Sequence, residues 1–291
     1  MSPTALFAIC TLAWGSTWLA IKFQLGVVAP GVSVAYRFAL AAALMAGWCL
    51  LTRRPLRFGG RDHALFAAQG VLYFGLNYVA IYLAEVHLAS GLVAVLFSTI
   101  TFMSLAGMRL VFGEAIAPRS VIGATLGVAG VTLLFLPEIL AARHGGSVAL
   151  GIAYALGGTF VATLGNLVSV AMHRRELPIL PSTAWGMAYG TLSTVIVVML
   201  SGAAWTFDAR LPYLLSLLYL ALVGSVVAFA AFLTLLKQVG AGPSAYVAVA
   251  TPVIAMLLST VVEGYRWTAL AVLGIGLAAV GNVFALRRGR R

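Results

Sequence analysis

Residues 211–236 read LPYLLSLLYLALVGSVVAFAAFLTLL and contain no charged side chain. A helix rises about 1.5 Å per residue, so a run of this length exceeds the roughly 30 Å hydrocarbon core of a bilayer. The run is continuously apolar, whereas a barrel strand would alternate apolar and polar residues over about ten positions. The stretch therefore predicts a transmembrane helix.

Nine similar runs of 17 to 25 residues occupy most of the remaining chain. They are residues 4–25, 32–51, 64–83, 88–112, 120–136, 148–171, 181–200, 243–262 and 267–286. Hydrophobic residues make up 62% of the 291 positions and charged residues 9%, too few charges to solvate a soluble domain of this length. We expect an all-α membrane protein with ten transmembrane helices in the bacterial inner membrane.

The first run has no basic residue before it and no small-residue cleavage motif, so we expect it to remain as a helix rather than act as a signal peptide. Thirteen basic residues lie in alternate loops and the C-terminal tail, whereas the opposite loops hold Arg143, Arg210 and Arg266. By the positive-inside rule, both termini are predicted to be cytoplasmic. The net charge of +11 then reflects topology and contact with anionic lipid rather than nucleic-acid binding.

The chain also carries a weak internal repeat. A shift of 151 positions superimposes Gly91 on Gly242, Gly113 on Gly264, Gly123 on Gly274 and Gly130 on Gly281. We infer two repeats, 1–140 and 141–291, joined through the turn-rich stretch 137–147. Five helices per repeat would invert the second copy in the membrane, an architecture typical of alternating-access transporters.

Three segments carry a family resemblance: Trp14-Gly15-Ser16-Thr17, Phe112-Gly113-Glu114 and Thr251-Pro252-Val253-Ile254-Ala255. With the ten runs, they resemble the EamA type of the drug/metabolite transporter (DMT) superfamily over essentially the whole chain, and most of all the aromatic amino-acid exporters of the YddG type. The resemblance implies a secondary carrier with a central cavity. The second repeat departs from the pattern, because Tyr265 matches Glu114 and Glu263 is displaced by two residues; a role in ordering the loop is expected for that glutamate.

The first run places Trp14, Trp18 and Lys22 on one helix face. They either line a cavity, with flat walls for a side chain and a cation for a carboxylate, or form an aromatic belt with a snorkelling lysine. Arg37 lies about six residues into the second run, where it is a functional candidate unless it snorkels or pairs with Glu85.

Polar residues in four other runs are further candidates. Asn77, Tyr78 and Tyr82 lie in the third run, where buried hydroxyls require partners. Asn166 belongs to a polar stripe that also suits bonding within its own helix or between helices. Pro252 frees a backbone carbonyl by kinking the ninth run, and the fourth run offers Ser98 and Thr99 without a kink. The predicted substrate-binding residues are Trp14, Trp18, Lys22, Arg37, Asn77, Tyr78, Tyr82, Ser98, Thr99, Asn166, Tyr246 and Pro252.

Other features bear on chemistry and packing. The acidic residues lie in loops or near predicted helix ends, no metal-ligand cluster or Walker motif occurs at membrane depth, and Cys10 and Cys49 read as free buried thiols. We therefore expect a cofactor-free monomer that is not an enzyme, with no buried acid and facilitated or exchange-type transport. Amino-acid export is the main hypothesis. The alternatives are export of organic cations, drugs or other metabolites, and a membrane enzyme or lipid scramblase.

Overall fold

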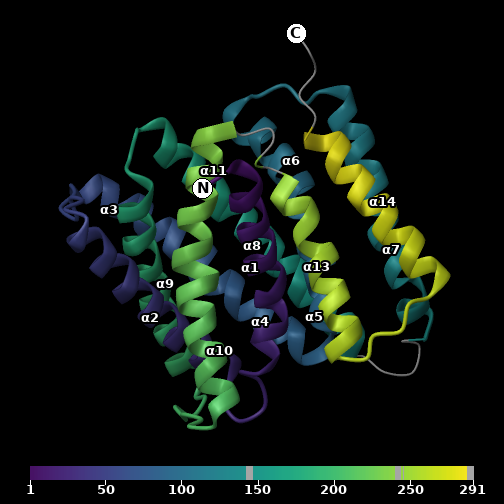
Figure 1. Cartoon of the computed structure of the whole chain (residues 1–291), viewed down its shortest axis with the longest axis horizontal. Helices are drawn as coiled ribbons and strands as arrows, with labels where there is room; N and C mark the ends of the chain where they lie inside the picture. The colour runs from purple at the N-terminus through teal and green to yellow at the C-terminus, as the bar shows by residue number, and fades with distance from the viewer. Residues whose placement is uncertain (142–146, 240–243, 245, 287–291) are drawn as a thin grey trace.

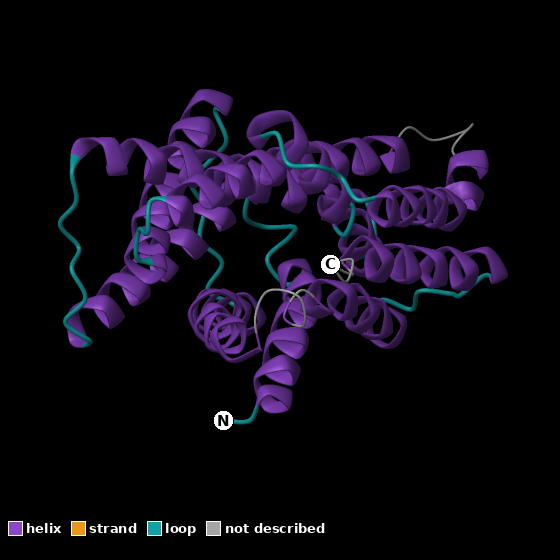
Figure 2. Ribbon diagram, turned by 90° about the horizontal axis from the view of Figure 1, so that it is seen from above, coloured by secondary structure: helices purple, strands orange, loops and turns teal. Residues whose placement is uncertain are grey.

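The computed structural model describes residues 1–141, 147–239, 244 and 246–286. In these ranges the chain consists of helices joined by loops, without strands (Figure 2). Residues 142–146 of the predicted repeat boundary and the tail residues 287–291 lie outside the described residues. The all-helical expectation is confirmed for the described part of the chain.

Every predicted apolar run is mostly helical over its described residues. The helices are α1 (Pro3–Lys22), α2 (Pro30–Leu51), α3 (Gly60–Gln69), η1 (Gly70–Leu76), α4 (Asn77–His87), α5 (Ser90–Phe97), α6 (Ile100–Phe112), α7 (Pro118–Ala141), α8 (Ser147–Arg174), α9 (Ile179–Ser201), α10 (Leu211–Ala221), η3 (Leu222–Val227), α11 (Ala228–Val239), α13 (Tyr246–Val262) and α14 (Ala269–Leu286). Counting consecutive helices as one, eight units among the described residues are long and apolar enough to cross a membrane, and two apolar helices near the C-terminus are shorter.

Two of these units contain a π-helical segment. The first, η1, lies between α3 and α4, and the second, η3, lies between α10 and α11. Their starts are 152 positions apart, close to the shift that superimposes the glycines. A π-helical turn alters the regular backbone pairing and leaves carbonyls for side chains to use.

The fourth apolar run differs from expectation, because it is interrupted between α5 and α6. Ser98 donates to the backbone oxygen of Val95 at 2.7 Å, and Thr99 donates to that of Leu96 at 2.6 Å. Hydroxyls that bond back to the preceding turn compete with the helical pairing and bend the helix. The predicted run is thus divided into two helices at Ser98 and Thr99, both of which keep right-handed helical backbone angles.

Helices α7 and α14 pack closely along their glycine faces. A Cβ atom on Gly130 would collide with the backbone oxygen of Gly274, and one on Gly281 would collide with the backbone of Gly127. This confirms that these glycines serve close helix packing. Cys10 and Cys49 are free and buried, as expected.

Helix α1 packs against α13, α11 and α5, which places it beside both the early and the late helices of the chain. Its first residues and the end of α14 lie toward the same, upper side of the molecule in Figure 1. We call the opposite side the Lys22 end, where α1 ends, and the upper side the Arg174 end, where α8 ends.

Candidate functional site

A cavity of about 440 Å³ lies among α1, α4, α5, α8, α11 and α13. The described residues that line it are Trp14, Thr17, Trp18, Ile21, Arg37, Gln69, Tyr73, Phe74, Asn77, Tyr78, Ile81, Ala94, Phe97, Ser98, Ile100, Asn166, Ser169, Ile179, Thr183, Phe229, Phe232, Ser244, Val247, Ala248, Thr251 and Pro252. Its lining includes Ile179, the first residue of α9, and Ser244, shortly before α13. The cavity thus reaches helix termini at the Arg174 end.

Aromatic rings form much of the wall. The Trp14 ring lies 5.5 Å from that of Phe229 and 5.2 Å from that of Phe232 between centroids, and Trp18 lies 5.3 Å from Phe97. The Nε1 of Trp14 donates to the backbone oxygen of Gly224 within η3 at 3.1 Å. The π-helical segment therefore fixes an aromatic wall suited to an apolar group.

Arg37 is the one charged residue in the described lining, and its exposure is 2%. Its Nη1 donates to the Tyr82 hydroxyl at 3.4 Å, and its guanidinium carbon lies 4.7 Å from the Tyr78 ring centroid. The Tyr82 hydroxyl in turn donates to Oε1 of Gln24 at 2.7 Å. These contacts hold the guanidinium in the wall by a long hydrogen bond and a cation–π contact.

Two amide side chains of the cavity lining have an unpaired oxygen. Asn77 donates through Nδ2 to the backbone oxygen of Tyr73 at 3.1 Å, and Gln69 donates through Nε2 to the Ser169 hydroxyl at 2.7 Å. The Oδ1 of Asn77 and the Oε1 of Gln69 are buried and have no hydrogen-bond partner. Each amide is thus oriented by its nitrogen, with its oxygen left free.

The Lys22 end is closed by contacts among α1, α4, α5 and α13. Nζ of Lys22 donates to the backbone oxygens of Glu85 at 2.5 Å and Leu88 at 2.7 Å, and lies 3.6 Å from Oε1 of Glu263. The Glu263 carboxylate accepts two bonds of 3.1 Å from the Ser90 backbone nitrogen and a further bond from its hydroxyl. We call Lys22, Glu85, Leu88, Ser90 and Glu263 the closing cluster.

Glu85 corrects one expectation. Its exposure is 0%, and neither carboxyl oxygen has a hydrogen-bond partner, although it interacts electrostatically with Lys22, Glu263 and Arg37. The prediction of no buried acid is therefore wrong, because packing against neighbouring helices covers a residue close to a helix end. Glu85 does not belong to the described cavity lining.

A second inter-helix ion pair lies at the Arg174 end. Nη2 of Arg174 donates to Oε1 of Glu114 at 2.6 Å, and its guanidinium lies 4.2 Å from the Phe112 ring centroid. These side chains are 48% and 51% exposed, against 26% and 16% for Lys22 and Glu263. The two pairs join the ends of helices that the sequence shift relates, and among the described residues the pair at the Lys22 end is the more deeply covered.

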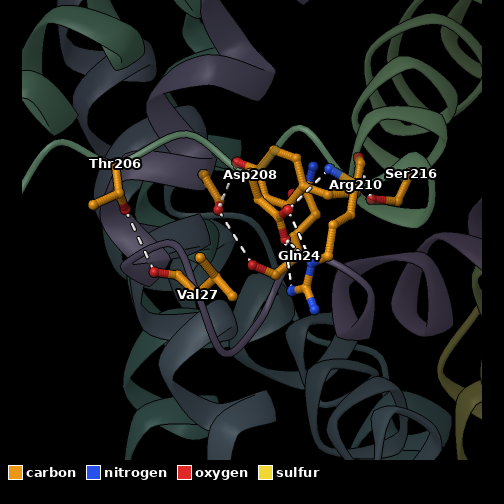
Figure 3. Close-up of polar contacts among 8 residues, drawn as sticks. Gln24, Val27, Thr206, Asp208, Arg210 and Ser216 are labelled. Atoms are coloured by element: carbon orange, nitrogen blue, oxygen red, sulfur yellow. Dashed lines mark hydrogen bonds and ion pairs between the residues drawn. The ribbon is translucent and has the colours of Figure 1, made fainter.

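The loop before α10 adds a cap at the Lys22 end (Figure 3). Thr206 donates to the backbone oxygen of Val27 at 3.4 Å, which joins this loop to the loop after α1. Arg210 donates through Nε and Nη2 to both carboxylate oxygens of Asp208. These bonds from Arg210 hold the pKa of Asp208 below its usual range.

Of the twelve predicted binding residues, eight line the cavity. They are Trp14, Trp18, Arg37, Asn77, Tyr78, Ser98, Asn166 and Pro252. Lys22 instead belongs to the closing cluster and Tyr82 supports Arg37, while Thr99 and Tyr246 lie outside the described lining.

The prediction left Phe97, Phe229 and Phe232 out of the site. Lipid-facing residues are apolar too, so the sequence does not distinguish a phenylalanine that lines a cavity from one that faces lipid. Thr159 and Thr163, which precede Asn166 in the polar stripe of α8, bond back to their own helix, the alternative that was expected for this stripe. Two of the segments that carry the family resemblance, Trp14–Thr17 and Thr251–Ala255, also meet in space, since Gly15 packs against Ile254.

A bundle of apolar helices around a cavity that is closed at one end and reaches helix termini at the other defines a membrane transporter. The EamA-like transporter family matches residues 2–136 and 149–287, and the chain belongs to this family, within the DMT superfamily. It is a multi-pass inner-membrane protein.

The chain is similar to three proteins that cover nearly all of it. An uncharacterized inner membrane transporter of Escherichia coli, YedA, is 28% identical over 285 residues, 95% of this chain and 89% of the relative. A probable amino-acid metabolite efflux pump of Escherichia coli is 23% identical and covers 97% of this chain and 95% of the relative. A protein crystal structure matches with a TM-score of 0.68 and 19% identity over 98% of this chain and 96% of the other, which supports the fold alone.

Proposed function

We propose that this protein exports amino acids, chiefly neutral and aromatic ones, or closely similar metabolites. The observation that carries the proposal is the cavity wall, in which Trp14, Trp18 and four phenylalanines lie together with polar side chains and one cation, Arg37. A pocket of this composition suits a substrate with an apolar body and a compact polar head. The similarity to a probable amino-acid metabolite efflux pump supports the same substrate class.

The proposed mechanism is alternating access by two inverted five-helix repeats, in a monomer with ten transmembrane helices and cytoplasmic termini. Three observations support it. The family matches two separate ranges, the π-helical segments η1 and η3 recur at nearly constant offset, and Gly113 and Gly264 have φ values of 70° and 69° at equivalent helix ends. With this topology, the cavity faces the cytoplasm and the closing cluster faces the outside.

Uptake into proteoliposomes tests the substrate class. A panel of radiolabelled amino acids, sugars, nucleosides and organic cations is presented to the purified protein, and empty liposomes serve as the control. We expect counterflow of aromatic or other neutral amino acids. Transport of organic cations alone would refute the proposal and favour the multidrug alternative. The positive charge of Arg37 in the cavity wall disfavours that alternative, because it repels a cationic ligand.

We propose facilitated or exchange-type transport, because Glu85, the fully buried acid, lies in the closing cluster rather than in the described cavity lining. A carrier couples to protons only if a group changes protonation between its two states. Accumulation under an imposed pH gradient is measured for the wild type and Glu85→Gln. Proton-driven accumulation that disappears in the variant would contradict this mechanism.

A further inference from the structure

Arg37 is a buried cation without a carboxylate in ion-pair contact. Among the described residues, the ion pairs involve Lys22, Arg174 and Arg210, and none includes Arg37. Its Nε has no hydrogen-bond partner, and its single side-chain hydrogen bond is the 3.4 Å contact with Tyr82. A buried guanidinium that is not fully paired gains strongly from a planar anion able to accept two parallel bonds.

The position of Arg37 allows a ligand to reach it. Its guanidinium lies over the ring of Tyr78, and both residues line the cavity. A Cβ atom on Gly224 would lie 3.8 Å from Nη2 of Arg37, so the guanidinium sits between α4 and the π-helical segment η3. The Thr17 side chain fills the space at Gly224, since a Cβ there would lie 2.6 Å from its methyl carbon, so a ligand reaches the guanidinium from the cavity that Thr17 and Arg37 both line.

An acceptor lies on the residue before Tyr78, whose ring contacts the Arg37 guanidinium. Asn77 precedes Tyr78, its Oδ1 is buried without a partner, and its nitrogen is held by Tyr73. The unpaired oxygen of Gln69 lies instead against Gly186 of α9. Neutral oxygens suit an ammonium group, which donates three hydrogen bonds and accepts none.

We infer that the cavity recognises a zwitterion: Arg37 binds the substrate carboxylate, and Oδ1 of Asn77 accepts a hydrogen bond from the substrate ammonium. The aromatic wall around Trp14 and Trp18 then receives an apolar side chain. The inference rests on the proposed transport function and narrows its substrate class to α-amino acids with apolar or aromatic side chains. It makes Arg37 the determinant of carboxylate selectivity.

The rival role for Arg37 is to neutralise Glu85, with which it interacts electrostatically. Lys22 and Glu263 also act on Glu85, so a variant that removes only Arg37 changes the charge balance of the closing cluster as well. The double variant Arg37→Gln with Glu85→Gln removes one charge of each sign. The double variant therefore leaves the net buried charge unchanged, and it distinguishes a role of Arg37 in neutralising Glu85 from a role in binding the ligand.

The test is binding to purified protein in lipid nanodiscs, with three probes of similar size. L-phenylalanine has both charged groups, 3-phenylpropionate lacks the ammonium, and phenethylamine lacks the carboxylate. We expect the wild type to bind the two carboxylates in preference to phenethylamine. Arg37→Gln should weaken L-phenylalanine binding about tenfold to a hundredfold, as expected for a lost charge-assisted bond, while Arg37→Lys recovers part of the affinity.

The controls separate the possible outcomes. Arg266→Gln, at an exposed loop arginine, should bind L-phenylalanine like the wild type. The double variant should stay weak; recovery of L-phenylalanine binding in it would overturn the inference and assign Arg37 to neutralising Glu85. Equal wild-type affinity for phenethylamine and L-phenylalanine, or no binding of L-phenylalanine, would also overturn it. The uptake panel is independent, so amino-acid transport with unchanged affinity in Arg37→Gln would refute the carboxylate site and leave the proposed function standing.

Discussion

Replacing Glu263 with glutamine should shift the protein toward the state that is open at the Lys22 end. Glu263 lies in the second range matched by the family, and its contacts Lys22 and Ser90 lie in the first. If the two repeats move apart on that side during transport, these contacts break. Their interaction free energy therefore stabilises the state that is closed at the Lys22 end relative to the open one.

The magnitude follows from the geometry. A hydrogen bond to a charged group contributes about 1.5 to 3 kcal/mol. Glutamine retains one acceptor oxygen for Ser90 but loses the charge that attracts Lys22, and both ionic side chains are mostly covered, with exposures of 26% and 16%. We expect a loss of about 1.5 kcal/mol from the closed state, which is roughly a tenfold change in the equilibrium.

Thiol labelling from outside the cell measures this change. Ala94 lines the cavity in α5 and is 1% exposed, so Ala94→Cys reports opening at the Lys22 end when Cys10 and Cys49 are replaced with alanine. In intact cells, a membrane-impermeant maleimide should react about tenfold faster in the Glu263→Gln background. The proposed topology places this end outside.

Glu114→Gln is the matched control. It removes the same charge from the ion pair with Arg174, whose side chains are about half exposed, so solvent screening limits the effect to a few tenths of a kcal/mol. Labelling should then change less than threefold. Unchanged or slower labelling in Glu263→Gln, with normal labelling of the parent, would refute the role of the closing cluster.

Two further predictions concern packing and pH. Gly130→Ala should destabilise the protein by about 1 to 3 kcal/mol, because the added methyl meets the backbone of Gly274. Gly276→Ala should not destabilise it, because a Cβ there would meet nothing within 4 Å. Thermal unfolding in detergent compares the two variants. Asp208→Asn should lower the unfolding temperature at pH 7 but make little difference at low pH. The bonds from Arg210 depress the pKa of Asp208 in the folded state, so their stabilisation is present above the unfolded pKa of about 4 and is lost as the pH falls through the folded value. An equal deficit of the variant at both pH values would contradict this.

Several features of the site were predictable from the sequence because they depend on residues of one helix. Trp14 and Trp18 are four positions apart and both face the cavity. Asn166 faces it as well, while Thr159 and Thr163 of the same stripe bond within their helix. Periodicity indicates which residues share a helix face. Which of them border the cavity depends on the neighbouring helices and does not follow from one helix alone.

The interruption at Ser98 and Thr99 shows a second limit. Either hydroxyl can bond to water, to a substrate or to the preceding turn, and the sequence does not rank these choices. The π-helical segments η1 and η3 are a similar case. Their glycines permit the close approach of neighbouring helices, since a Cβ on Gly70 would meet the backbone of Gly186 and Gly190, but which helix approaches is a tertiary question.

The sequence by itself determined the class of the protein: helical, membrane-embedded and without enough charge for a soluble surface. That follows because transfer of an apolar run into lipid depends on the length and composition of the run itself. Only the tertiary structure decided the surroundings of the charged residues, among them the burial of Glu85, the carbonyl partners of Lys22 and the incompletely paired guanidinium of Arg37. The free energy of a buried charge depends on the groups that surround it, and here those groups come from helices far apart in the chain.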